Sequence, residues 1–157
     1  MPNTTPAETA PLDAAWAALA AGESAALRAH LAALPEGAVD SAARARLAAR
    51  AALQDGLPEA ALRHLAEAVT ADPSDPATLI DLAALQRAAG ERTLAEKLLD
   101  AAERLDDSHP EAHALRASLA QDAGDATAAL RHLRTACALA LTRAAADPAP
   151  GSASRSR

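Results

Sequence analysis

Histidine and cysteine are the side chains in this sequence that could bind a metal ion or act as nucleophiles. His109 and His113 are four residues apart, the spacing of a metal-binding pair on one helix. His109 precedes Pro110, however, which places it just outside a helix that begins at the proline, and no third ligand is close in sequence. We therefore predict no metal site, and interpret His109 as a helix cap and His113 as an exposed or packing side chain.

The single cysteine, Cys137, lies in the apolar run Ala-Cys-Ala-Leu-Ala-Leu, where a small buried thiol fits packing better than nucleophilic chemistry. His132 is five residues away, so the two side chains do not share a helix face. The sequence also contains no glycine-rich phosphate loop, paired-carboxylate motif or serine elbow. We predict no catalytic residue and no cofactor, and therefore no enzyme.

Two arginines have the spacing of a carboxylate-binding pair. Arg46 and Arg50 are four residues apart and share one face of any helix that contains them. Guanidinium groups bind carboxylates through paired hydrogen bonds, so these arginines could bind an acidic peptide. The alternative, which the sequence leaves open, is that both belong to an ordinary solvated surface.

The composition restricts the elements that can position these side chains. The chain has 157 residues, enough for one domain, with Trp16 as its one aromatic residue. Alanine and leucine dominate while valine, isoleucine and threonine are scarce, which favours helices over strands. Arginine largely replaces lysine, a bias typical of GC-rich bacterial genomes. The fold class predicted is all-α.

The net charge of −6 and the pI near 5.3 argue against general binding to nucleic acid or to anionic membranes, both of which favour a basic surface. The first residues contain no positive charge and no apolar run, and no stretch approaches 18 uncharged apolar residues. The one cysteine is compatible with a reducing compartment. We expect a soluble, cytoplasmic protein.

A period of 34 residues organises the chain. Gly22, Gly56, Gly90 and Gly124 recur at this interval, each between two helical patterns. A glycine can end a helix in a left-handed conformation, and small residues let two helices approach closely. Each unit is thus predicted to be a helical hairpin. The same interval relates three further columns, namely Ala61, Ala95 and Ala129, then Leu65, Leu99 and Leu133, then Ala68, Ala102 and Ala136.

This pattern resembles the tetratricopeptide-repeat family, whose period is 34 residues and whose repeats require small residues at fixed positions. The resemblance covers roughly residues 42 to 143, although smaller side chains replace the family's aromatic residues. It implies a right-handed α-solenoid of antiparallel helical hairpins. The domain predicted spans 11–145, with a degenerate capping unit at 11–41, repeats at 42–75, 76–109 and 110–145, and disordered tails at 1–10 and 146–157.

The resemblance also implies a function in binding proteins, because the first helices of successive units line a concave groove in this family. The chain lacks the lysines and asparagines with which some members grip a C-terminal carboxylate. We expect an adaptor or scaffold for a protein or acidic peptide; a secretion-type chaperone and a regulatory partner of a neighbouring enzyme are alternatives. The groove positions are occupied by Arg46, Arg50, Leu53, Ile80, Ala84, Arg87, Ser118 and Gln121.

The last predicted helix, roughly 126 to 144, is longer than the others and is followed by no polar capping helix. One face of it remains apolar after packing on the preceding helix, which predicts self-association or the docking of a partner. The alternatives are that the tail from residue 145 covers this face, or that its alanines make it too weakly apolar to matter. The face consists of Leu130, Leu133, Cys137 and Leu141.

Overall fold

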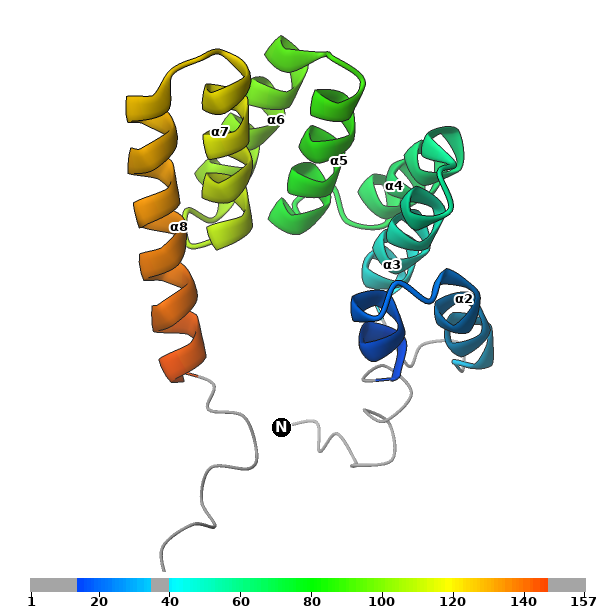
Figure 1. Ribbon diagram of the computed structural model, residues 1–157. Coiled ribbons are helices and arrows are strands. Elements are labelled where there is room, and N and C mark those ends of the chain that lie inside the picture. The colour runs from blue at the N-terminus through cyan, green and yellow to red at the C-terminus, as the bar shows by residue number, and fades with distance from the viewer. Residues whose placement is uncertain (1–13, 35–39, 147–157) are drawn as a thin grey trace, which may run out of the picture.

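The computed structural model describes residues 14–34 and 40–146, and all regular secondary structure in these ranges is helical. A helical segment at 14–20 and seven further helices form consecutive antiparallel hairpins that stack into an arch (Figure 1). The predicted all-α solenoid is therefore confirmed. The helices are α2 (Ser24–Ala33), α3 (Ser41–Gln54), α4 (Pro58–Ala71), α5 (Pro76–Ala88), α6 (Arg92–Leu105), α7 (Pro110–Asp122) and α8 (Ala126–Ala146).

A glycine turn joins the two helices of each hairpin. Gly90 follows α5 with φ +84°, and the next N–H, that of Glu91, donates to the Gln86 carbonyl over 2.9 Å. A residue with a Cβ in this left-handed conformation would cost the fold roughly 1–2 kcal/mol of stability. The other three periodic glycines also have positive φ, between 71° and 76°. The glycine spacing thus predicted the hairpin turns correctly.

The links between hairpins differ at the start of α5 and of α7. Asp75 caps α5, since its carboxylate accepts hydrogen bonds from the backbone N–H groups of Ala77 and Thr78 over 3.1 and 3.0 Å. His109 occupies the same place before α7 but makes no side-chain cap hydrogen bond. Its Nε2 lies 3.2 Å from the Asp106 carboxylate instead. His109 is therefore the N-cap residue of α7, as the sequence predicted, but its ring faces neighbouring acids and does not cap the helix backbone.

The core follows the leucine and alanine columns of the repeat. Leu65 and Leu99 are fully buried, each packed in a cluster with a leucine from the first helix of the next hairpin, Leu85 and Leu119 respectively. Full burial of a leucine stabilises a fold by roughly 1.5–3 kcal/mol. Leu133 holds the same place in α8, yet 41% of it is exposed. Neighbouring hairpins therefore bury each other's leucines.

The last helix ends close to its predicted boundary. α8 continues to Ala146, slightly past the expected end near 144. The predicted disordered tails lie outside the described residues, apart from Ala146 itself. None of the helices in the described ranges is long and apolar enough to cross a membrane.

Candidate protein-binding groove

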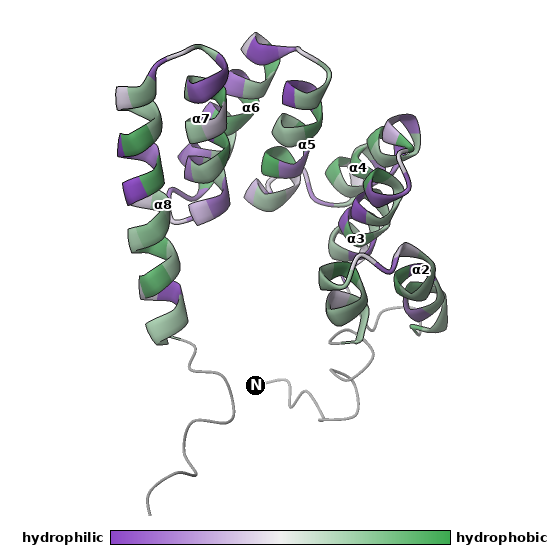
Figure 2. Ribbon diagram, in the orientation of Figure 1, coloured by the Kyte–Doolittle hydropathy of each residue, from purple (hydrophilic) through white to green (hydrophobic). Residues whose placement is uncertain are grey.

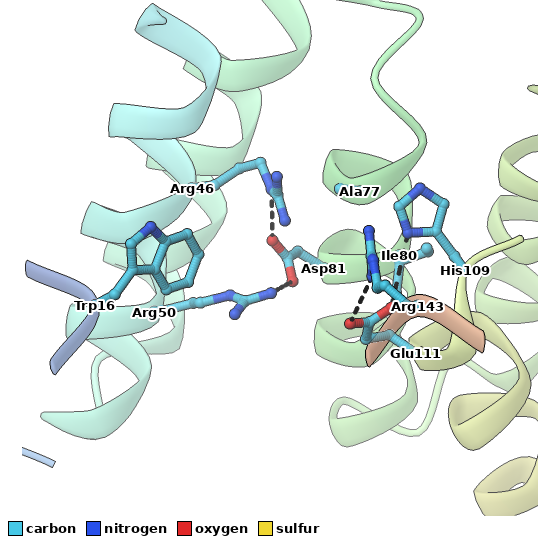
Figure 3. Close-up of a pocket in the computed structure, with 9 residues that line it drawn as sticks. All are labelled: Trp16, Arg46, Arg50, Ala77, Ile80, Asp81, His109, Glu111 and Arg143. Carbon is cyan, nitrogen blue, oxygen red and sulfur yellow. Dashed lines mark hydrogen bonds and ion pairs between the residues drawn. The ribbon is translucent and has the colours of Figure 1, made fainter. Parts of the chain in front are cut away.

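A cavity of about 390 Å³ opens between the first helices of the hairpins. α3 forms one side of it and the start of α7 and the end of α8 form the other, with α5 between them (Figure 3). The helical segment 14–20 adds one residue at its edge. The lining residues are Trp16, Arg46, Arg50, Ala77, Ile80, Asp81, His109, Glu111 and Arg143.

Arg46 and Arg50 point from α3 into this cavity and bind the same carboxylate. Arg46 Nε donates to one oxygen of Asp81 over 2.8 Å, and an Arg50 terminal nitrogen donates to the other over 2.9 Å (Figure 3). The Asp81 side chain is only 15% exposed, so water screens these ion pairs less than it screens pairs on the open surface. The pair of arginines therefore connects two repeats and also faces the cavity.

An aromatic ring lies next to the arginines. The guanidinium carbon of Arg50 is 5.8 Å from the ring centre of Trp16, within the range of a cation–π contact. Trp16 is 41% exposed, so much of its surface remains available. This edge of the cavity thus combines a flat apolar surface with positive charge.

The opposite wall carries charges of both signs. A terminal nitrogen of Arg143 lies 3.6 Å from the Glu111 carboxylate, and His109 Nδ1 lies 3.7 Å from the other oxygen of that carboxylate (Figure 3). The Arg143 and Glu111 side chains are 60% and 55% exposed, so this ion pair is open to water. It contributes little stability and can exchange partners readily.

A second ion pair between repeats lies along the same row of first helices. Arg87 in α5 forms two hydrogen bonds, of 2.7 and 3.1 Å, with the carboxylate of Asp122 in α7. The hydrogen bond from Arg87 holds the pKa of Asp122 below its usual range. The separation of these residues is 35, as it is for Arg46 and Asp81. An arginine and an acid one residue more than a repeat apart therefore face each other across successive first helices.

The family model for the tetratricopeptide repeat matches residues 52–119. Residues 52–119 therefore contain tetratricopeptide repeats. The crystal structure of MamA, which is 14% identical, has a TM-score of 0.60 over 88% of this chain and 81% of its own. At that identity the likeness shows a shared fold alone. A second structure, MamA MSR-1 C2, is 16% identical over 87% of this chain and 98% of its own, but its TM-score of 0.47 supports no comparison. No curated protein matches the chain.

Tetratricopeptide repeats are generally protein-interaction modules without catalytic activity, which supports a protein as the partner of this chain. Of the residues assigned to the groove from the sequence, Arg46, Arg50 and Ile80 line the cavity. The other five lie on the same first helices but do not line it: Arg87, which binds Asp122; Ser118, whose hydroxyl donates to the Ala114 carbonyl; and the exposed Leu53, Ala84 and Gln121.

The repeat columns of the sequence do not reveal the acid that holds the two arginines. Asp81 could have been found from its separation of 35 residues from Arg46. The columns of small residues show only the spacing of 34. Trp16 and Arg143 have no comparable signal, because they come from the two ends of the described chain and line one cavity only when the arch forms. The lining residues that the groove pattern did not include are Trp16, Asp81, His109 and Arg143.

The histidines are arranged differently from a metal site. The ring of His113 stacks on that of His132, with centres 5.9 Å apart and planes inclined by 22°. Burial, followed by the positive charges of Arg131 and Arg116, lowers the pKa of His132. Within the described ranges, no group of three or more histidine, cysteine, aspartate or glutamate side chains is placed to hold a metal ion.

The interpretation of Cys137 as a buried thiol is wrong, because its side chain is exposed. Ala136 takes the buried position of the repeat column, and Cys137 lies beside it on a face that no described helix covers. The other residues of the predicted apolar face are exposed as well, with Leu130 at 51%, Leu133 at 41% and Leu141 at 72%.

Proposed function

We propose that this protein is a non-enzymatic adaptor that binds an acidic segment of another protein in its concave groove. The observation that supports the proposal most strongly is the pair Arg46 and Arg50 beside the exposed ring of Trp16, all lining one cavity. The alanine- and arginine-rich composition supports a bacterial source, and the single exposed thiol supports a reducing, cytoplasmic compartment.

The two arginines retain donors for a ligand after binding Asp81. Each guanidinium has five N–H donors, and the hydrogen bonds to Asp81 use one nitrogen of each group. Arg50 is also 34% exposed, so a carboxylate can approach it from the cavity. A ligand carboxylate would then share the guanidinium groups with Asp81 or displace it.

The apolar part of the groove supports binding of the residues that flank such a carboxylate. Trp16 offers a flat ring at the edge, and Ile80 and Ala77 lie on α5 beside the arginines. Aromatic and arginine side chains are the types that contribute most to binding energy at protein interfaces. An acidic segment that also contains an apolar side chain is therefore the ligand proposed.

The experiment is affinity capture with the whole chain followed by mass spectrometry. Arg46→Glu with Arg50→Glu is expected to lose the captured partner, because the variant repels an acidic ligand. The matched control is Arg63→Glu with Arg104→Glu, which makes the same charge change at exposed sites on the second helices α4 and α6. Circular dichroism and thermal unfolding establish that both variants are folded. Equal capture by the two folded variants would contradict the proposal.

A further inference from the structure

The last helix exposes a surface that every earlier hairpin buries. Leu65 in α4 and Leu99 in α6 are 0% exposed, while Leu133, one period further on, is 41% exposed. The difference is not in the hairpins themselves, because Ala61, Ala95 and Ala129 are all buried in the same way. It arises because α5 and α7 cover the earlier leucines, whereas no described helix follows α8.

The interface between α6 and α7 shows which side chains such a covering helix uses. From α7, Ala112 and Leu119 pack in the cluster around Leu99. Arg116, which lies between them in sequence, binds Glu103 through two hydrogen bonds of 2.6 and 2.9 Å and Asp100 through one of 2.7 Å. The covering helix therefore presents a small residue, a charged residue four positions later and a leucine three positions after that, all on one face.

The charge on α8 is opposite to that on α6. At the positions 34 residues beyond Asp100 and Glu103, α8 has Arg134 and Cys137. α8 contains no acidic residue at all, and three of its exposed side chains are arginines. Within the described residues, Arg131 and Arg134 have no carboxylate partner. The hydropathy colouring shows the C-terminal half of α8 as mainly hydrophobic (Figure 2).

We propose that an acidic amphipathic helix from a different protein docks on this α8 surface, which comprises Leu130, Leu133, Arg134, Cys137 and Leu141. This helix would continue the solenoid. It would carry a small residue, then a carboxylate four positions later that faces Arg134, and then a leucine three positions after the carboxylate that covers Leu133. This surface is separate from the groove, so the proposal does not depend on groove binding.

Charge also disfavours a second copy of the chain as the occupant. The first helices α3, α5 and α7 carry Ala48, Leu82 and Arg116 at the position where the carboxylate is needed. Two α8 helices packed against each other would bring arginines together without any acid between them. Like charges in contact at an interface oppose association.

The probes are two stapled helical peptides with the sequence of residues 110–122, one unchanged and one with Arg116→Glu. The staple is needed because isolated helices of this length are marginal in water. Fluorescence anisotropy with the full chain is expected to show roughly tenfold tighter binding of the glutamate peptide. Arg134→Glu in the protein should reverse that preference. Leu133→Glu should abolish binding of both peptides, and both substituted side chains are exposed enough to leave the fold intact.

Three outcomes would overturn the proposal. In the first, the two peptides bind equally, or Arg134→Glu leaves their order unchanged. In the second, sedimentation shows a dimer of the chain that Leu133→Glu converts to a monomer, so that a second copy occupies the surface. In the third, the glutamate peptide binds only after residues 147–157 are removed, so that the chain's own C-terminal segment occupies it.

Discussion

The hairpin of α5 and α6 and the hairpin of α7 and α8 have the same repeat pattern but different surroundings. In the first, Leu79 and Leu98 pack at the edge of the core cluster, while His113 and His132 stack at the corresponding positions of the second. Leu99 is buried by the following hairpin and Leu133 is not. The repeat thus determines how each hairpin folds, and the place of the hairpin in the array determines what it buries and what it leaves for partners.

The largest expected effect concerns the leucine column. Leu99→Ala should lower the free energy of unfolding by about 3 kcal/mol, because it removes a fully buried side chain and leaves a cavity. Leu133→Ala should lower it by less than about 1 kcal/mol, because Leu133 is already partly in water. Urea denaturation of the two variants measures both values. Equal losses would mean that α8 is covered in solution.

A smaller effect is expected at the helix starts. Asp75→Ala should cost about 1–2 kcal/mol, since it removes the cap of α5 and the partner of the buried Thr78 hydroxyl. His109→Asn should instead stabilise the fold by about 0.5–1 kcal/mol, by giving α7 the cap that it lacks. Thermal unfolding of both variants tests this contrast. An asparagine variant less stable than the parent would show that the contacts of His109 outweigh a cap.

The smallest effect is the pH dependence of stability that His132, in the last hairpin, contributes. The pKa of His132 is lower in the folded chain than its ordinary value of 6.5, so the unfolded chain binds more protons as pH falls. The free energy of unfolding therefore carries no penalty from His132 above pH 6.5, and it falls as the pH is lowered below that value. His132→Leu, which introduces the residue found at position 98, should reduce the loss of stability between pH 7 and pH 5. Unchanged pH dependence in unfolding experiments would contradict this assignment.

Local features of the fold were predictable from the sequence. A left-handed residue after a helix strongly favours glycine, so the four glycines at intervals of 34 revealed the hairpin turns directly. The columns containing Leu65 and Leu99 likewise identified the core, because buried positions in a repeat require the same residue type. In both cases successive repeats need the same residue type at the same position, so the requirement is visible as a column in the sequence.

The candidate site was less predictable because its contacts cross units. Arg46 and Arg50 were identified from their spacing, but their partner Asp81 belongs to the next repeat. Trp16 and Arg143 reach the cavity from opposite ends of the described chain, so the shape of the whole arch decides their position. The exposure of Cys137 was mispredicted because its apolar sequence neighbours suggested burial, whereas no described helix covers that face of α8.

The central claim, that Arg46 and Arg50 bind ligand carboxylates, is tested most directly by releasing them from Asp81. The probe is a fluorescein-labelled peptide of six glutamates flanked by leucines. Its binding is measured for the parent chain, for the variant Asp81→Asn, and for the double variant Arg46→Gln with Arg50→Gln. The thermal stability of all three proteins is measured as well. Both variants should be less stable than the parent, because both remove the ion pairs between α3 and α5.

The two variants should differ in binding. We predict that Asp81→Asn binds the peptide about threefold to fivefold more tightly than the parent, because the guanidinium of Arg50 and the Nε of Arg46 can then pair with the glutamates, while Arg46 keeps its 3.6 Å ion pair with Asp75. The arginine variant should bind it more weakly than the parent. Binding that falls in both variants in proportion to stability, or that changes in neither, would contradict the claim and show that the arginines only join the repeats.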